Sequence, residues 1–235
     1  IQNAVLTVFR KYIKISKNLN KIDDPIIHRK LINLRKINPK RFGQLYNEIC
    51  LSASLRAIFY TDKFLKLSAK LLNIKKENLF INGFMLRLDV PNDKRNTLSW
   101  HQDAPYYEQT YPNYNSAVCW LPLIQNSEKT GSIKFIEKSH NKILKQVRLT
   151  KKNELSATQF KLKIDEKNLK IKNFNSDFGD LAFFDMLMVH KSGFNQSQKV
   201  RINFGCRIHD FSKKINIGQE VYIYNKTKKS QLIFK

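Results

Sequence analysis

The sequence has 235 residues, of which 42% are hydrophobic and 26% are charged, so it can form a packed core and does not have the composition of a disordered chain. Lys and Arg number 43 against 19 Asp and Glu, giving a net charge of +24, which suggests nucleic acid, anionic lipid or an acidic substrate as a partner. The basic residues spread from Arg10 to Lys235, and the sequence is also rich in Asn and Ile, so we favour the codon bias of an A/T-rich genome over a dedicated polyanion site.

Three observations bear on the compartment. No apolar run approaches the roughly 20 residues of a membrane span, and no basic patch precedes an apolar stretch, as it does in a signal peptide. Cys50, Cys119 and Cys206 are too few and too scattered for a disulfide framework. We therefore expect a cytoplasmic protein without a membrane span. The sequence begins with Ile1 rather than Met, which leaves the natural start of the chain open.

The first third of the chain predicts helices. Val5 and Phe9 recur at helical spacing, as apolar residues do along one face of a helix. Asp24 before Pro25 is typical of a helix N-cap followed by proline in the first turn. We expect these helices to form a layer that packs on a larger unit.

Beyond residue 78 the pattern changes to short segments rich in Ile, Val, Phe and Tyr, separated by Asn, Gly, Pro and Asp. Such regularly spaced short strands are typical of a sandwich or barrel. The stretch 151–175 is rich in Lys and predicts an inserted loop with one edge strand. We predict a single domain, 1–235, with a helical layer, 1–78, packed on a β core, 79–235. The predicted strands are Leu79 to Leu88, Ala117 to Ile124, Ser132 to Ile136, Gly179 to Phe184, Met186 to His190, Val200 to Ile208 and Val221 to Tyr224.

The densest chemical signal is the segment 99–103, which reads Ser-Trp-His-Gln-Asp. On a strand, His101 and Asp103 point to the same face because side chains alternate, so the pair could hold one metal ion. A third ligand must come from elsewhere, and His190, which ends an apolar run, is the candidate that we choose. The other histidines are expected at the surface, in a turn and at a strand end: His28, His140 and His209.

Two histidines and one carboxylate form the facial triad of non-haem Fe(II) oxygenases, which leaves three coordination positions open. Arg201 lies eleven positions after His190 and begins an apolar strand. A guanidinium group pairs with a carboxylate in a fixed geometry. Arg201 is therefore a candidate for binding the far carboxylate of a co-substrate.

The order and spacing of several motifs together resemble the phytanoyl-CoA dioxygenase family. These motifs are Trp100 to Asp103, Trp120, Gly131 to His140, Gly179 to His190, and Arg201. The resemblance extends over about residues 80–210 of this sequence. It implies a mainly β protein with a helical N-terminal layer, whose core is a double-stranded β-helix, a cupin-like jelly roll.

The resemblance also implies cofactors and site residues. The cofactors are Fe(II), 2-oxoglutarate as co-substrate, and dioxygen. The implied iron ligands and catalytic residues are His101, Asp103 and His190. The implied contacts with 2-oxoglutarate are Arg201, which would bind its distal carboxylate, Ser192, Trp120 and Met85.

These roles imply a dioxygenase that hydroxylates a C–H bond of a small metabolite. Related halogenases lack the carboxylate ligand, so the presence of Asp103 favours hydroxylation. The surplus of basic residues predicts an anionic substrate, which positive charge would attract. The loop from Ala104 to Asn115 directly follows the metal motif, and we predict that its Tyr106 and Tyr107 contact the substrate, although packing within the loop is an equal alternative.

Two other functions stay open from the residues alone. A zinc-dependent hydrolase could use the same His, Asp and His ligands with water in the fourth position, but this gives Arg201 and Ser192 no role. A non-catalytic jelly-roll binding protein, including a nucleic-acid binder, would account for the basic surface. We expect no nucleic-acid partner, because the tyrosines cluster after the metal motif rather than across a sheet face.

Overall fold

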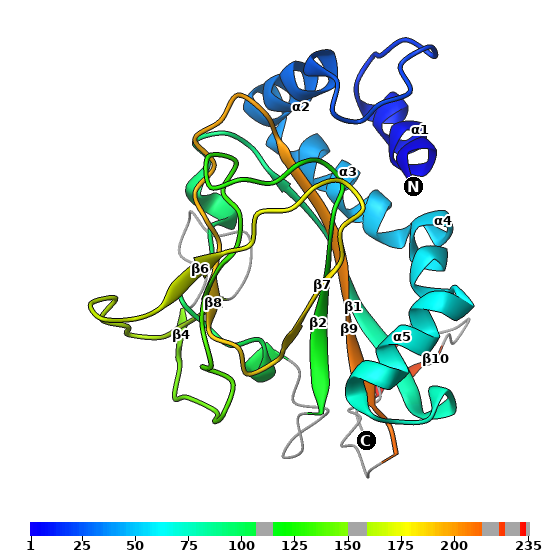
Figure 1. Ribbon diagram of the computed structural model, residues 1–235. Helices are drawn as coiled ribbons and strands as arrows, with labels where there is room; N and C mark the ends of the chain where they lie inside the picture. Colours follow the sequence, from blue (N-terminus) through cyan, green and yellow to red (C-terminus); the bar gives the residue numbers. More distant parts are fainter. Residues whose placement is uncertain (107–114, 150–158, 213–220, 224–230, 234–235) are drawn as a thin grey trace.

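A computed structural model describes residues 1–106, 115–149, 159–212, 221–223 and 231–233. The described chain begins with helices and continues as short strands (Figure 1). None of the helices among these residues has the length and apolar character that a membrane span requires. The helices are α1 (Gln2–Tyr12), α2 (Pro25–Ile37), α3 (Pro39–Leu51), α4 (Ala53–Arg56) and α5 (Asp62–Leu72), with 3-10 turns η1 (Ala57–Tyr60), η2 (Lys76–Asn78), η3 (Lys94–Asn96) and η4 (Ala104–Tyr106).

Side chains at the helix starts supply the hydrogen bonds that the first turn lacks. The Asp24 carboxylate accepts a hydrogen bond from the Ile26 amide at 2.8 Å, and Pro25 occupies the first turn, as the sequence predicts. Asn38 plays the same part for α3, accepting from the Arg41 amide at 2.9 Å. These caps fix where α2 and α3 begin.

Four antiparallel strands form the larger sheet, in the order β1-β9-β2-β7. Their bounds are β1 (Leu79–Asp89), β2 (Ser116–Pro122), β7 (Ala182–Asp185) and β9 (Arg201–Asp210). A smaller antiparallel sheet has the order β6-β3-β8, with bounds β3 (Lys134–Ile136), β6 (Ile171–Asn173) and β8 (His190–Lys191). Two further pairs join β4 (Val147–Leu149) to β5 (Gln159–Lys161), and β10 (Val221–Ile223) to β11 (Gln231–Ile233).

The smaller sheet faces the larger one, so the two enclose an interior (Figure 1). His101 and His190 form an antiparallel bridge that adds the metal-motif segment to the edge of the smaller sheet beside β8. This arrangement is a double-stranded β-helix, and it confirms the predicted jelly roll with its helical N-terminal layer.

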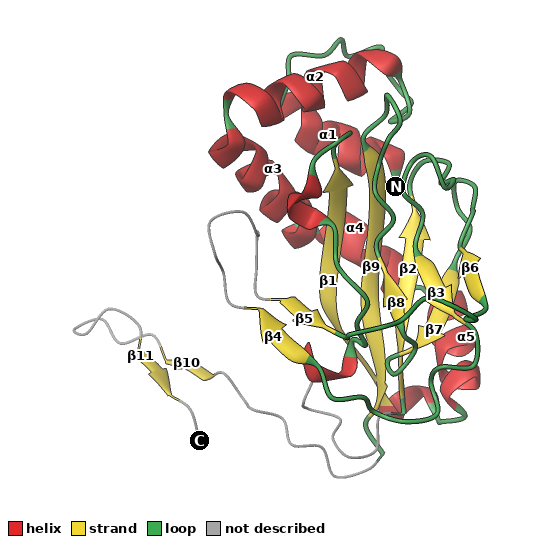
Figure 2. Cartoon of the chain, turned by 90° about the vertical axis from the view of Figure 1, so that its left-hand side faces the viewer, coloured by secondary structure: helices red, strands yellow, loops and turns green. Residues whose placement is uncertain are grey.

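The two faces of the larger sheet differ in chemistry because side chains alternate along each strand. On the outer face Leu86, Ile202 and Phe204 are fully buried in one core with residues of the helices, such as Phe9, and Figure 2 shows helices covering this face. Burial of one such side chain contributes about 1.5–3 kcal/mol. A one-residue slip of β9 would exchange this apolar set with the polar inner set, so the core fixes which β9 residues face the interior.

Two predictions about the strands are wrong. The segment Met186 to His190 is a turn followed by a two-residue strand rather than one strand, since the Met188 amide donates to the Asp185 carbonyl at 2.9 Å and the Leu187 amide donates to the Asp185 carboxylate at 2.7 Å. The stretch 151–175 carries two strands, β5 and β6, rather than one; residues 150–158 lie outside the described part.

The expectation that His28 lies at the surface is also wrong. Its side chain is buried on the inner side of α2, where Nε2 lies 2.8 Å from Asp23 Oδ1 and Nδ1 accepts a hydrogen bond from the Val200 amide at 3.2 Å. His28 therefore ties the helical layer to the residue just before β9.

Candidate metal centre and active site

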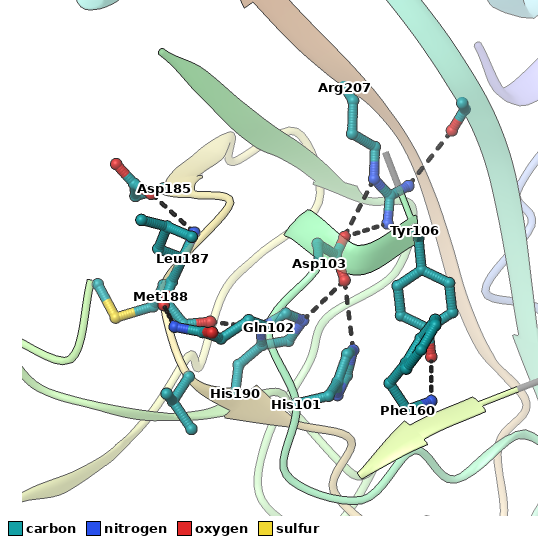
Figure 3. A network of polar contacts seen from close by, with 12 residues as sticks. His101, Gln102, Asp103, Tyr106, Phe160, Asp185, Leu187, Met188, His190 and Arg207 are labelled. Carbon is teal, nitrogen blue, oxygen red and sulfur yellow. Dashed lines mark hydrogen bonds and ion pairs between the residues drawn. The ribbon is translucent and has the colours of Figure 1, made fainter. Parts of the chain in front are cut away.

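The fold brings together the three predicted metal ligands. His101, Asp103 and His190 are buried, and each offers a ligand atom within 4.8 Å of the others. Asp103 Oδ1 lies 3.3 Å from His101 Nε2 and 3.6 Å from His190 Nε2 (Figure 3).

Backbone hydrogen bonds hold the ligand-bearing segments side by side. The His101 amide donates to the His190 carbonyl at 2.9 Å, and the His190 amide donates back at 3.0 Å. The Asp103 amide donates to the Met186 carbonyl at 3.0 Å, in the turn that precedes His190. The unexpected turn thus has a function, because it returns the chain so that His190 faces His101.

Both imidazole rings are oriented as metal ligands. His101 Nδ1 lies 2.7 Å from the Ser99 carbonyl oxygen, and His190 Nδ1 lies 2.9 Å from the Met188 carbonyl oxygen. A carbonyl oxygen only accepts, so each Nδ1 carries a proton, which leaves Nε2 as the atom through which each neutral ring can bind a metal. Burial, together with neighbouring His101, lowers the pKa of His190 to about 4, which keeps this ring neutral at pH 7.

Arg207 of β9 holds the carboxylate, a partner that the sequence analysis did not identify. Its Nε and Nη2 both donate to Asp103 Oδ2, at 3.1 and 2.5 Å. Burial alone would raise the pKa of Asp103, but the positive charge of Arg207, and then the two histidines, keep it well below its ordinary value. Asp103 is therefore ionised, with Oδ2 bound to Arg207 and Oδ1 facing the histidines.

These atoms fit a divalent cation. Two lone-pair nitrogens and one carboxylate oxygen converge, and His101 Nε2 forms no hydrogen bond within the described part of the chain. A buried polar atom without a hydrogen bond is costly, and a bound cation would remove that cost. Two neutral imidazoles and one carboxylate are the donor set of non-haem Fe(II) sites.

Arg201 lies at the other end of the inner face and belongs to a buried cluster of three charges. Asp89 of β1 accepts from Arg201 Nε and Nη2 through Oδ2, at 3.0 and 2.5 Å, and from Arg87 Nη2 through Oδ1, at 3.2 Å. The pairing with both arginines keeps the pKa of Asp89 low in spite of burial. Two guanidinium groups and one carboxylate leave one positive charge in the interior.

Two hydrogen-bond donors of this cluster lack an acceptor among the described residues. Arg201 Nη1 and Arg87 Nε are buried and have no hydrogen-bond partner among the described residues. An unpaired buried donor is costly, and a further carboxylate would satisfy both atoms. Sequence reasoning found Arg201 but missed Arg87 and Asp89, although their alternation on a strand was a usable signal.

Two of the other predicted co-substrate residues, Met85 and Trp120, lie between this cluster and the metal ligands along the inner face. Met85 and Trp120 flank Gly205 of β9 in register, and Trp120 Nε1 is a further buried donor without a described partner. A Cβ at Gly205 would come within 2.5 Å of the Cys119 carbonyl oxygen, so only glycine fits there. Ser192 is half-buried two residues after His190, and its amide donates to the Leu98 carbonyl at 3.0 Å.

Of the two tyrosines predicted to contact the substrate, the structure describes Tyr106 but not Tyr107. Tyr106 packs edge-on against His101, with 6.0 Å between ring centroids, and its hydroxyl accepts a hydrogen bond from the Phe160 amide at 2.8 Å. Tyr106 therefore joins the metal motif to β5, and contact with a substrate stays a prediction. Tyr107 lies outside the described residues.

Two other side chains around the centre have structural roles. Gln102 is fully buried, donates to the carbonyls of Leu187 and Lys142 at 2.6 and 2.9 Å, and accepts from the Leu144 amide at 2.8 Å. It locks the metal motif to the turn before His190. His209 lies between Ser116 Oγ and Asn82 Oδ1, at 2.9 Å from each, and is not part of the cluster of metal-binding atoms.

A jelly roll with a two-histidine, one-carboxylate centre defines the class of non-haem iron oxygenases. The family model for phytanoyl-CoA dioxygenase matches residues 46–203, about two thirds of the chain. The chain belongs to the phytanoyl-CoA dioxygenase (PhyH) family of Fe(II)- and 2-oxoglutarate-dependent oxygenases, and the cofactors of this class are Fe(II), 2-oxoglutarate and dioxygen. No curated protein sequence matches the chain.

Solved structures share the fold at low sequence identity. ThoJ, described as a non-heme monooxygenase, has a TM-score of 0.60 at 19% identity, over 100% of this chain and 75% of that one. EctD from S. alaskensis with 2-oxoglutarate and 5-hydroxyectoine has a TM-score of 0.55 at 18% identity, over 72% and 57%. EvdO2 from Micromonospora carbonacea var. aurantiaca with 2-oxoglutarate has a TM-score of 0.53 at 14% identity, over 67% and 63%. The chain thus spans less than two thirds of EctD and EvdO2.

Proposed function

We propose that this chain hydroxylates a C–H bond of a small metabolite, with Fe(II) held by His101, Asp103 and His190. The observation that carries the proposal is the convergence of three buried ligand atoms, one each from His101, Asp103 and His190. When bound, iron together with 2-oxoglutarate and dioxygen supplies the oxidant, inserting one oxygen atom into the substrate while 2-oxoglutarate becomes succinate and carbon dioxide. Asp103 fills the position that halogenases leave to a halide, which supports hydroxylation.

The inner face of the larger sheet supports a role in binding the co-substrate. Arg201 would bind the distal carboxylate of 2-oxoglutarate through Nη1, while Asp89 keeps its guanidinium group in place. Trp120 would donate its unpaired indole N–H, and Met85 and Ser192 would contact the chain of the co-substrate. These roles follow the family resemblance, and the unsatisfied donors support them independently.

The composition of the chain bears on the nature of the substrate. The net charge of +24 predicts an anionic metabolite, and attraction to a basic surface would speed its capture. Contacts from Tyr106 and Tyr107 also remain predictions.

The proposal is tested by turnover of 2-oxoglutarate to succinate, in the presence of Fe(II) and air, against a panel of small metabolites. We expect succinate formation to rise with the true substrate and to vanish in His190→Ala. Failure of the Fe(II)-loaded protein to bind 2-oxoglutarate in an anaerobic titration would contradict the proposed function, whatever the panel contains.

A further inference from the structure

A cavity of about 550 Å³ opens beside the proposed iron ligand His190. It runs along β7, which is the last strand of the larger sheet, and across to β3 of the smaller sheet. None of the proposed contacts with 2-oxoglutarate lines it. The cavity is therefore a separate space that reaches the metal centre from the side of β7.

The walls of this cavity are mainly apolar. Phe135, Phe174 and Phe184 contribute aromatic rings, and Ile133 and Met188 contribute aliphatic surface. The ring of Phe184 packs against His190 with 4.9 Å between centroids, so the apolar wall extends up to the metal ligand. A hydrocarbon body would gain the free energy of leaving water there, about 25 cal/mol per Å² of buried apolar surface.

One carboxylate borders the cavity. Asp185 at the end of β7 is half-buried, and one of its oxygens accepts the Leu187 amide hydrogen bond. None of the described residues forms a hydrogen bond with the other oxygen of Asp185. Burial raises the pKa of Asp185 above its ordinary value, although the Leu187 amide and the neighbouring His140 act in the opposite direction. In Figure 3 Asp185 lies on the far side of Leu187 and Met188 from Asp103.

Positive side chains are absent where an anionic ligand would need them. Among the described residues that border the cavity there is no Lys or Arg, and the one other polar side chain besides Asp185 and His190 is His140. An anion placed here would meet the charge of Asp185 and lose its hydration, with His140 as the one lining side chain outside the metal ligands that could donate to it. The basic character of the chain thus does not extend into this cavity.

We propose, on the basis of the proposed function, that this cavity binds the substrate and that the substrate is a small molecule with an apolar body and a protonated amine. The body packs against the phenylalanine rings next to His190, and the amine pairs with Asp185 at the outer end. Aromatic walls suit this class, because they accept hydrocarbon surface and attract a cation through their faces. The proposal departs from the anionic substrate that net charge predicts.

Three probes of one shape test this class: 4-phenylbutylamine, 4-phenylbutanol and 4-phenylbutyrate, which are cationic, neutral and anionic at pH 7. Binding is measured by calorimetry on protein loaded with redox-inactive Zn(II) and 2-oxoglutarate. We expect the amine to bind at least about tenfold more tightly than the carboxylate, a difference of about 1.4 kcal/mol. The neutral alcohol should lie between them.

Two variants test whether the charge of Asp185 and the space of the cavity determine these affinities. Asp185→Asn keeps an oxygen for the Leu187 amide but removes the charge, so we expect the three affinities to come within about threefold of each other. Ala182→Trp adds bulk where Ala182 borders the cavity and should weaken all three probes while 2-oxoglutarate still binds. Equal or tighter binding of the carboxylate, an unchanged preference in Asp185→Asn, or no binding of any probe would overturn the proposal.

The same titrations separate this inference from the proposed function. If 2-oxoglutarate binds and the probes show no preference for the amine, the substrate class is wrong and the oxygenase proposal stands. If the amine preference depends on Asp185 but 2-oxoglutarate does not bind, the cavity assignment stands and the proposed function fails.

Discussion

Arg207 and Asp103 meet through two hydrogen bonds on a single carboxylate oxygen, from Nε at 3.1 Å and from Nη2 at 2.5 Å. With Oδ2 occupied in this way, Oδ1 is the oxygen that faces His101 and His190. The pair therefore favours a carboxylate that binds metal through one oxygen, which keeps coordination positions open for co-substrate and dioxygen.

We predict that Arg207→Met weakens Fe(II) binding about 10- to 100-fold, the usual effect of removing a group that orients a ligand. Arg207→Lys, which keeps the charge but not the two-pronged geometry, should lose less. The measurement is an anaerobic Fe(II) titration. Arg10→Met is the matched control, because Arg10 donates to two backbone carbonyls beside α1, and its affinity should equal that of the parent. Unchanged affinity in both Arg207 variants would show that the pair has no part in metal binding.

Two matched variants, one at His190 and one at His209, test which histidine is the third metal ligand. Both are buried histidines, but His209 bonds Ser116 and Asn82, whereas His190 Nε2 faces Asp103. His190→Ala should lower Fe(II) affinity by more than about 100-fold, since loss of a ligand exceeds loss of an orienting group. His209→Gln should bind Fe(II) as the parent does. The opposite result would reassign the ligand.

Much of the metal centre could be predicted from local sequence, because His101 and Asp103 are two positions apart; the structure brings their side chains together although the segment forms an isolated bridge at His101 rather than a strand. His190 lies far away in the sequence; its place at the end of an apolar run made it the candidate, and the family resemblance implied the same ligand. The sequence analysis did not identify Arg207, because its partner Asp103 lies 104 positions away in the chain. The fold of β9 against β1 and β2 is needed to bring the two residues together.

The errors have physical causes as well. The run from Phe183 to Val189 is almost wholly apolar, and an apolar run does not reveal a turn made by one side chain, here Asp185. His28 has charged neighbours in sequence, yet its helical face turns inward, and its hydrogen bond to the Val200 amide spans 172 positions. Contacts of this range depend on packing rather than on local pattern.

The charge cluster at Asp89 makes a prediction about co-substrate selectivity. 2-Oxopentanoate has the same keto acid group as 2-oxoglutarate but lacks the distal carboxylate. Truncating one partner of a buried charge pair costs about 2–5 kcal/mol, so Arg201→Gln should weaken 2-oxoglutarate binding at least about 30-fold and leave 2-oxopentanoate unchanged. Arg87→Gln should act in the same direction, because its Nε is the second unsatisfied donor.

Competition of both acids against each other, on protein loaded with Zn(II), measures this selectivity. Binding of 2-oxopentanoate is the internal control for folding and for the metal site. If both acids weaken equally in Arg201→Gln, the arginine supports the fold rather than the distal carboxylate. If Arg87→Gln keeps the full preference for 2-oxoglutarate over 2-oxopentanoate while Arg201→Gln loses it, the role of Arg87 is limited to its ion pair with Asp89.

The buried histidines predict how the stability of the metal-free protein depends on pH. Burial, and then the charge of Arg207, lower the pKa of His209 to about 4, against about 6.5 in an unfolded chain. Between these values the folded protein binds fewer protons than the unfolded one. The contribution of His209 is therefore complete above pH 6.5 and is lost as the pH falls through the folded pKa.

We expect the free energy of unfolding, measured with denaturant in the presence of a chelator, to fall from pH 7 to pH 5. His209→Gln should reduce that fall by about 2 kcal/mol, because glutamine can bond Ser116 and Asn82 without titrating. Part of the fall should persist, since burial also lowers the pKa of His190 and of His28. His140→Gln, at an exposed position, is the control and should follow the parent. A fall in His209→Gln as large as in the parent would show that His209 is not held neutral by its surroundings, and that its two hydrogen bonds tolerate a charged ring.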